Sequence, residues 1–173
     1  MEKFSKISSA SRHKKTSDDW RFLADSMLGS LARWLRILDY DTEYERFISD
    51  EELIRRSNVE DRIALTKDRR LARRRALRQV LLIDGVSLSE QLTQVLSLTG
   101  DDPLRRPLFR RCLECNQRLE EISVAEAVPM VPPYVLQTQD RFLRCPACRR
   151  VFWAGTHRTR MLERLESLVI RQD

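Results

Sequence analysis

The chain has 173 residues, which is enough for one ordinary domain and a small additional module. Hydrophobic residues make up 42% of the chain, so we expect a packed core and exclude a globally disordered protein. The formal net charge is +6 and charged residues make up 34%, which predicts attraction to a polyanion such as nucleic acid. Composition leaves open the alternative of a basic protein without a polyanionic partner.

The first 19 residues are polar and rich in Ser and Lys, which predicts a disordered basic tail over residues 1–19. This stretch has no apolar core, so a secretory signal is not expected. No run in the sequence reaches the roughly 18 apolar residues of a membrane span. We therefore expect no membrane partner and a cytoplasmic location, where cysteines stay reduced.

The segment 20–100 alternates between short apolar runs and segments whose apolar residues have helical spacing. The run at residues 21–24 predicts a strand. Apolar residues then recur at helical spacing over residues 27–38. This pattern predicts an amphipathic helix with Arg33 and Arg36 off its buried face.

The middle of this segment predicts two more strands and two more helices. Apolar and β-branched residues predict strands over residues 42–45 and 62–66. Ser49, with Glu52 three residues later, predicts a capping box at the start of one helix. The very basic stretch of residues 69–78 predicts the other helix.

The last strand and helix of the segment follow the same pattern. Residues 79–83 predict a strand, and Ser87 with Glu90 predicts a second capping box. Gly100 is expected to end the helix, because glycine readily adopts the conformation that terminates helices. The alternation of strands and helices predicts an α/β fold with a mostly parallel sheet flanked by helices.

Acidic residues follow the predicted strands, either directly or in the next loop. In an open parallel sheet the carboxyl ends of the strands share one edge, so such residues converge in space. Carboxylates gathered at one edge suit Mg²⁺ or Mn²⁺, and helix caps or turn residues are the alternative. The main candidates for catalysis are Asp25, Asp50 and Asp68, and two further candidates are Asp84 and Glu51.

Basic residues surround these acids in the sequence, with few acids at helical spacing to pair with them. A dense basic face of this kind suits the phosphate backbone of RNA, although a solvated helix face is the usual alternative. The candidates for RNA binding are Arg33, Arg36, Lys67, Arg69, Arg73 and Arg74.

Four cysteines form two Cys-x-x-Cys pairs, Cys112 with Cys115 and Cys145 with Cys148. Two such pairs supply four thiolates for a tetrahedral site. We therefore expect one structural Zn²⁺, with no open position for chemistry. Disulfides, a redox pair and an iron–sulfur cluster are the alternatives.

The cysteines also divide the C-terminal part of the chain. Residues 101–111, which begin after the last predicted helix, are expected to be a linker. Residues 112–160 predict a small zinc ribbon, with a loop or insertion between the cysteine pairs because three prolines lie there. Residues 161–173 predict a final helix.

Several stretches resemble the PIN-like ribonucleases of the Mut-seven C-terminal family, over about residues 21 to 161. The most specific are the stretch from Ala24 to Arg36 and the motif Thr66-Lys67-Asp68. The others follow in the order of the family: Tyr40-Asp41-Thr42, Ser49 to Leu53, the two cysteine pairs, Val131 to Tyr134 between them, and Gly155-Thr156-His157.

This resemblance implies a PIN-like fold and metal-dependent cleavage of RNA, with Asp25, Asp50 and Asp68 matching the acidic residues of the family. The chain departs from the family pattern at Asp39, where a glycine is usual, and at Ser30, where a lysine is common. Neither departure removes an expected metal ligand.

The sequence therefore predicts a metal-dependent ribonuclease with RNA as its partner. One alternative is a non-catalytic RNA- or ribosome-binding protein that keeps the fold and uses only its basic faces. Another is a toxin-like nuclease with a protein antitoxin, which the attached ribbon disfavours. Retention of all three aspartates favours the enzyme.

Overall fold

The computed structural model describes residues 5–7 and 19–170. The chain divides into two compact units, residues 1–109 and residues 110–173. No helix in the described ranges is long and apolar enough to cross a membrane.

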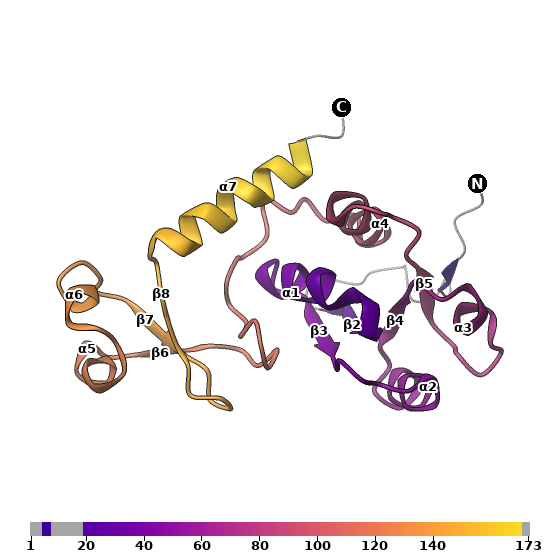
Figure 1. The fold of residues 1–173 in the computed structure, drawn as a ribbon, viewed down its shortest axis with the longest axis horizontal. Helices are drawn as coiled ribbons and strands as arrows, with labels where there is room; N and C mark the ends of the chain where they lie inside the picture. Colours follow the sequence, from indigo (N-terminus) through magenta and orange to yellow (C-terminus); the bar gives the residue numbers. More distant parts are fainter. Residues whose placement is uncertain (1–4, 8–18, 171–173) are drawn as a thin grey trace. The chain divides into compact units, whose positions relative to one another are not determined.

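A five-stranded sheet forms the centre of the first unit (Figure 1). Four parallel strands lie in the order β5-β4-β2-β3, which confirms the expected mostly parallel sheet. A short strand, β1, is added antiparallel to β5. The bounds are β1 Ser5–Lys6, β2 Arg21–Ala24, β3 Asp41–Tyr44, β4 Ile63–Thr66 and β5 Val80–Leu82.

Strand β1 lies within the segment expected to be a disordered tail, and that expectation is wrong for residues 5–7. Ser5 lies opposite Leu81 and Lys6 lies opposite Val80. Ile7 is buried after the strand, so an apolar side chain fixes this segment to the unit. The rest of the tail lies outside the described residues.

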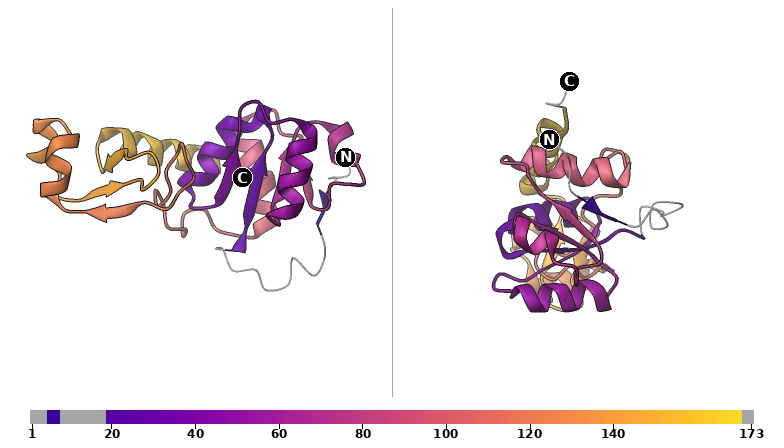
Figure 2. Two further views of the ribbon diagram at one scale, coloured as in Figure 1. Left: turned by 90° about the horizontal axis from the view of Figure 1, so that it is seen from below. Right: turned by 90° about the vertical axis from the view of Figure 1, so that its right-hand side faces the viewer.

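Helices follow the strands and cover both faces of the sheet, with α2 and α4 on opposite sides (Figure 2). Helices α1 and α4 pack against each other, whereas α2 and α3 contact β4. The short helix η3 (Ser26–Leu28) precedes α1 (Gly29–Ile37). The remaining helices of the unit are α2 (Asp50–Val59), α3 (Arg69–Arg73) and α4 (Leu88–Thr99).

Alternating side chains of each strand build the core on the two faces. On the α2–α3 face, Leu23, Ala64 and Val80 pack in one buried cluster with residues of both helices. On the other face the fully buried ring of Phe22 lies edge-on against Tyr40, with ring centroids 5.6 Å apart. The sheet is therefore covered on both sides, as expected for parallel strands.

Helix α3 is shorter than the sequence predicts, because it ends at Arg73 and not near Arg78. The chain turns away so that Leu77 enters the core, where only 1% of it is exposed. Asn58 fixes this turn: its Nδ2 donates to the Ala76 carbonyl at 2.7 Å, and its Oδ1 accepts from the Arg78 N–H at 3.1 Å. The free energy gained by burying Leu77 exceeds the free energy that further turns of a basic, self-repelling helix would contribute.

The two predicted capping boxes have different outcomes. Ser87 and Glu90 form the complete reciprocal box at the start of α4. Ser49 caps α2 by accepting from the Glu52 N–H at 3.2 Å, but the Glu52 carboxylate pairs with Arg55 and leaves the box half formed. A nearby arginine therefore competes successfully for the carboxylate.

The beginning of the expected linker belongs to the first unit. The Arg106 guanidinium is buried, lies 3.8 Å from the ring centroid of Tyr40, and donates from Nε to the Leu38 carbonyl at 2.6 Å. Asp101 pairs with Arg106 at 2.8 Å, and its Oδ2 accepts a hydrogen bond from the Tyr40 hydroxyl at 2.7 Å. Burial raises the pKa of Tyr40, so its hydroxyl stays a donor.

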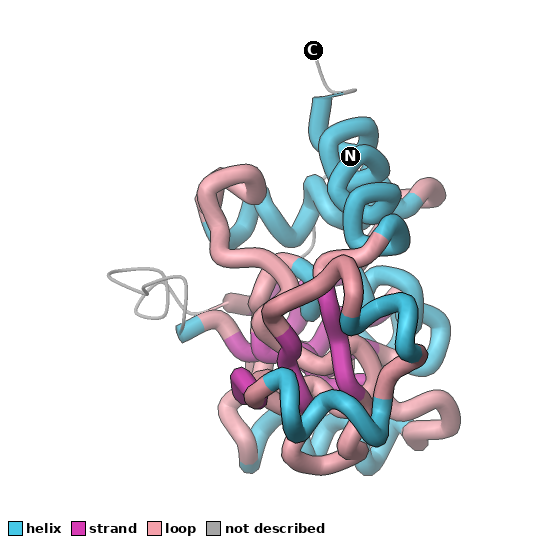
Figure 3. Tube along the Cα trace, turned by 90° about the vertical axis from the view of Figure 1, so that its left-hand side faces the viewer, coloured by secondary structure: helices cyan, strands magenta, loops and turns pink. Residues whose placement is uncertain are grey.

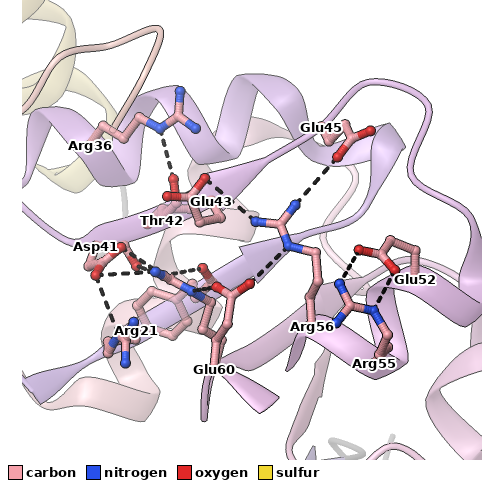
Figure 4. Close-up of polar contacts among 12 residues, drawn as sticks. Arg21, Arg36, Asp41, Thr42, Glu43, Glu45, Glu52, Arg55, Arg56 and Glu60 are labelled. Carbon is pink, nitrogen blue, oxygen red and sulfur yellow. Dashed lines mark hydrogen bonds and ion pairs between the residues drawn. The ribbon is translucent and has the colours of Figure 1, made fainter. Parts of the chain in front are cut away.

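Ion pairs join α2 to β3, in part through Arg62, which directly precedes β4 (Figure 4). Arg62 is 5% exposed and pairs with Asp41 at 2.7 Å and Glu60 at 2.6 Å. Arg56 pairs with Glu60 at 3.0 Å and with Glu45 at 3.4 Å. Burial alone would raise the pKa of Glu60, but hydrogen bonds from the two arginines lower it.

The second unit holds a three-stranded antiparallel sheet in the order β6-β7-β8. Its strands are β6 (Glu120–Ile122), β7 (Phe142–Arg144) and β8 (Val151–Trp153). The insertion expected between the cysteine pairs contains α5 (Val124–Ala127), η4 (Val128–Met130) and α6 (Pro133–Leu136), drawn cyan in Figure 3.

A small core joins this insertion to the sheet. Ile122 and Phe142 of the strands pack with Ala127, Val131 and Val135 of the insertion. The final helix, α7, spans Thr156–Ile170 and so begins five residues before the expected start at residue 161. Residues 171–173 of the expected helix lie outside the described part of the chain.

Candidate functional site

Asp25 lies at the carboxyl end of β2, between β4 and β3 in the sheet, and is 8% exposed. Its backbone N–H donates to the Leu65 carbonyl at 2.9 Å, which continues the pairing of β2 with β4. Its Oδ1 accepts from the Ser26 N–H at 2.6 Å and caps η3. The sequence places this acid correctly because it directly follows a buried strand.

Thr66, the last residue of β4, connects Asp25 to Asp68. Its fully buried hydroxyl donates to Asp25 Oδ2 at 2.7 Å and accepts from the Asp68 N–H at 3.0 Å. Asp68 Oδ1 accepts from the N–H groups of Arg70 and Leu71 at the start of α3. One hydroxyl thus fixes the two aspartate-bearing loops to each other.

Thr66 was not among the site residues predicted from the sequence. The motif Thr66-Lys67-Asp68 contributes to the family resemblance, which assigns a role to its aspartate alone. A hydroxyl at the end of a buried strand, two residues before an aspartate, is the signal that points to it, because Ser and Thr side chains bind the backbone two residues on.

Asp50 and Glu51 begin α2 and share one cation. Arg74 pairs with Asp50 at 3.2 Å and with Glu51 at 3.1 Å. Hydrogen bonds, first from the backbone N–H of Glu51 itself and then from Arg74, lower the pKa of Glu51. Arg74, predicted to bind RNA, is therefore shared by two of the predicted catalytic acids.

Asp84 follows β5 and pairs with Arg69 at 3.1 Å. The edge of the sheet thus carries acids from four successive βα connections, as the sequence predicts. Among the residues that the structure describes, however, no three of these carboxylates come close enough to form a ready-made group of metal ligands. Asp25 and Asp68, from the ends of adjacent strands, are linked through Thr66.

The predicted RNA-binding residues have different environments. Arg33, Arg69 and Arg73 are exposed, and Lys67 is half-buried. Arg36 is 4% exposed, and its Nε donates to the Thr42 carbonyl at 2.8 Å (Figure 4). The expectation that Arg36 lies off the buried face of α1 is wrong, because this guanidinium satisfies a carbonyl of β3.

The four cysteines of the second unit form one compact group. Their Sγ atoms all lie within 4.8 Å of one another, and Cys112 Sγ lies 3.7 Å from Cys148 Sγ. All four are free thiols, which excludes the disulfide alternative for this structure. A tetrahedral site with Zn–S bonds of about 2.3 Å has S–S edges of about 3.8 Å, so the group fits a metal ion.

The thiols differ in acidity because their surroundings differ. Burial raises the pKa of Cys115 to about 12, and burial also raises that of Cys112. A backbone hydrogen bond from Arg150 lowers the pKa of Cys148 to about 7. Four thiolates packed this closely require a cation to share their charge.

Fold and sites define an α/β domain with aspartates along one edge of its sheet, followed by a module with four clustered cysteines whose spacing fits a metal ion. A sequence profile of the Mut7-C RNase domain matches residues 20–165, which is most of the chain. The chain belongs to the Mut7-C RNase family, which confirms the resemblance seen in the sequence. A search of curated proteins and a search of solved structures each found no match.

Proposed function

We propose that this protein is a metal-dependent ribonuclease that hydrolyses phosphodiester bonds of RNA, in RNA processing or decay in the cytoplasm. Membership of an RNase family and the net charge of +6 support RNA as the partner. The four free thiols suit a reducing compartment.

The observation that carries this proposal is the hydrogen-bonded link Asp25–Thr66–Asp68. It holds two carboxylates at the ends of adjacent strands, where ligands bind in open parallel sheets. Asp68 Oδ1 accepts both backbone hydrogen bonds at the start of α3, so Oδ2 would be the oxygen that binds a metal ion.

The donor set at this edge fits Mg²⁺ or Mn²⁺, because it consists of carboxylate oxygens. Asp25 and Asp68 would hold the metal, with Asp50 completing the site after Arg74 has moved to phosphate. When bound, the metal supplies an activated water and neutralises charge on the scissile phosphate. Thr66 keeps Asp25 oriented by donating to it throughout.

The exposed cations near this edge would position the RNA backbone. Arg33, Arg69 and Arg73 have exposed side chains, and Lys67 precedes Asp68 directly. Arg74 already lies beside acids of the edge and would exchange Asp50 and Glu51 for a phosphate. Arg36 is left out of this set because it is buried against β3.

We also propose that the four cysteines bind one structural Zn²⁺. The group has four protein ligands, so it leaves no open coordination position for substrate. Its role is to fold the second unit around the metal.

A non-catalytic RNA- or ribosome-binding protein is the second candidate. It is favoured by the pairing of Arg74 with Asp50 and Glu51, which neutralises part of the acidic edge without any metal. In that case the basic residues would bind RNA and the aspartates would serve as helix caps.

Cleavage of RNA by the full chain in Mn²⁺ or Mg²⁺ tests the two candidates. Asp25→Asn and Asp68→Asn should lower cleavage by orders of magnitude, because each removes a charged ligand at nearly constant size. RNA binding should persist in both variants. Asp61→Asn is a matched control, since Asp61 is exposed before β4, at the opposite end of that strand.

Full activity in Asp25→Asn and Asp68→Asn would show that the nuclease site does not lie at this edge. Binding without cleavage by the wild-type chain, on structured and unstructured RNA alike, would favour the non-catalytic candidate.

A further inference from the structure

A phenylalanine stands exposed at the tip of the connection between β3 and α2. Phe47 is 83% exposed, although the side chain next to it, Ile48, is buried in the core on the α2–α3 face. A turn hydrogen bond from the Ile48 N–H to the Glu45 carbonyl, 3.4 Å long, holds the two residues in these positions. The fold therefore anchors one apolar side chain and presents the next one to solvent.

The ring of Phe47 already has a cation beside it. The guanidinium carbon of Arg46 lies 5.4 Å from the ring centroid, within the range of cation–π attraction. Arg46 is itself exposed. An aromatic ring and a guanidinium side by side are the two groups on which unpaired nucleobases stack.

The location of this pair ties it to the acidic edge. Phe47 follows β3 by three residues and precedes Asp50 by three, so it lies in a βα connection at the carboxyl end of the sheet. Two other βα connections at this edge carry strongly exposed apolar residues beside their acids, with Met27 71% and Val86 87% exposed. Phe47 is the one of the three with a flat ring for stacking.

We propose that Phe47 and Arg46 form a stacking site for an unpaired nucleobase of an RNA strand whose backbone runs along the acidic edge. The identity of the ligand rests on the proposed ribonuclease function. A base enters such a site only when it has left a helix, so the site selects single-stranded segments.

Charge favours a nucleic acid over a protein at this position. The connection between β4 and α3, two strands away from β3 in the sheet, carries Lys67, Arg69 and Arg70, so the same edge offers cations for phosphates along the strand from the stacked base. A protein interface would instead bury a broad apolar surface, whereas Phe47 is preceded by the exposed charged residues Glu45 and Arg46 and followed by the buried Ile48.

Binding of an unstructured oligoribonucleotide to the zinc-loaded full chain tests this site. The Asp25→Asn background, without added Mg²⁺ or Mn²⁺, prevents cleavage during the measurement. A 2-aminopurine base in the oligonucleotide reports stacking as a loss of fluorescence.

Phe47→Ala should weaken binding about 5- to 150-fold, because stacking of one base contributes roughly 1–3 kcal/mol. The fluorescence loss should disappear with it, and Phe47→Trp should restore both. Val59→Ala is the matched control, since Val59 is 73% exposed at the other end of α2 and should change neither. Duplex RNA should bind equally to all variants.

Unchanged oligonucleotide affinity and quenching in Phe47→Ala would overturn the stacking site. If the wild-type chain still cleaves RNA in that case, the ribonuclease proposal stands without it. Absence of RNA binding by the wild-type chain would overturn both. A concentration-dependent dimer that Phe47→Ala abolishes, with RNA affinity unchanged, would assign the ring to contacts between copies of this chain.

Discussion

At the scale of single residues, the hydroxyl of Thr66 determines how the two central aspartates are held. It is completely buried, donates to Asp25 and accepts from the Asp68 N–H. Without it the buried carboxylate oxygen of Asp25 would lose a partner, which costs about 1–3 kcal/mol, whereas the part-buried Asp68 N–H can donate to water instead.

Thr66→Val is therefore expected to lower the free energy of unfolding by about 1–3 kcal/mol, because valine keeps the shape but has no hydroxyl. RNA cleavage should fall as well, since Asp25 loses the bond that orients it. Thr66→Ser keeps the hydroxyl and serves as the control. Urea unfolding and cleavage assays on the same preparations measure both effects. A Thr66→Val variant with full activity and full stability would show that the hydrogen-bonded link Asp25–Thr66–Asp68 is not needed.

Two residues show what the sequence could not predict at this scale. Arg36 is buried because it binds a carbonyl of a neighbouring strand, and no helical periodicity reports on such a partner. Asp39 has φ of 61° in the left-handed region, where glycine is usual and aspartate is tolerated. The departure from the family glycine therefore leaves the backbone conformation in place.

At the scale of elements, the ion pairs of α2 connect this helix to β3, in part through Arg62. Arg62 and Arg56 both bind Glu60 at the end of α2, and Arg62 also reaches Asp41 of β3 (Figure 4). Arg62 donates further to the Phe22 carbonyl at 3.2 Å. A buried guanidinium with this many partners is costly to disturb from either side.

The pH dependence of stability should reveal this network. The folded-state pKa of Glu60 lies below its unfolded value, so its stabilising effect is complete above the unfolded pKa of about 4.3. It is lost as the pH falls through the lowered folded pKa. Glu60→Gln should be about 1 kcal/mol less stable than the wild type at pH 7.

The difference between these two proteins should begin to shrink as the pH falls below the unfolded pKa of glutamate, and it should approach zero below the lowered folded pKa. Urea unfolding at several pH values measures it. Both proteins carry the same cysteines, so any acid-induced loss of metal cancels in the comparison. A difference that stays constant with pH would mean that Glu60 acts by packing and not by charge.

At the scale of the whole molecule, the two units depend on different sources of stability. The first buries its sheet under helices on both faces. The second has a small core of five fully or largely buried residues beside the four cysteines. A core this small needs a metal, because little apolar surface is removed from water.

Purified protein should carry one Zn²⁺ per chain, measured by elemental analysis. Removal of the metal with a chelator should unfold β6, β7 and β8, while hydrogen exchange at β2, β4 and β5 stays slow. Cys112→Ser should reproduce this result, and Ser167→Ala should not. Retained protection of β6 to β8 in the metal-free protein would show that the small core suffices.

The sequence predicts the order of strands and helices, the acidic edge and the cysteine group, because each depends on local periodicity or spacing. The end of α3 at Arg73 and the pairing of Arg74 with Asp50 depend on contacts between distant segments. Turn positions such as Phe47 are equally hard to predict, since exposure of a phenylalanine depends on which neighbour is anchored.

Strand β1 also affects whether copies of this protein associate through the edges of their sheets. Without it, β5 would present a row of unpaired backbone groups at the margin of the sheet, and such margins recruit strands from other molecules. Ser5 and Lys6 occupy those groups, and Lys6 is also held by the Arg74 carbonyl at 3.1 Å. We expect a shortened chain that begins at Trp20 to keep every predicted catalytic residue but to associate through the exposed edge of β5, which size-exclusion chromatography would measure. Residues 5–7 are therefore expected to limit association between chains, a property separate from the chemistry at the carboxyl ends of the strands.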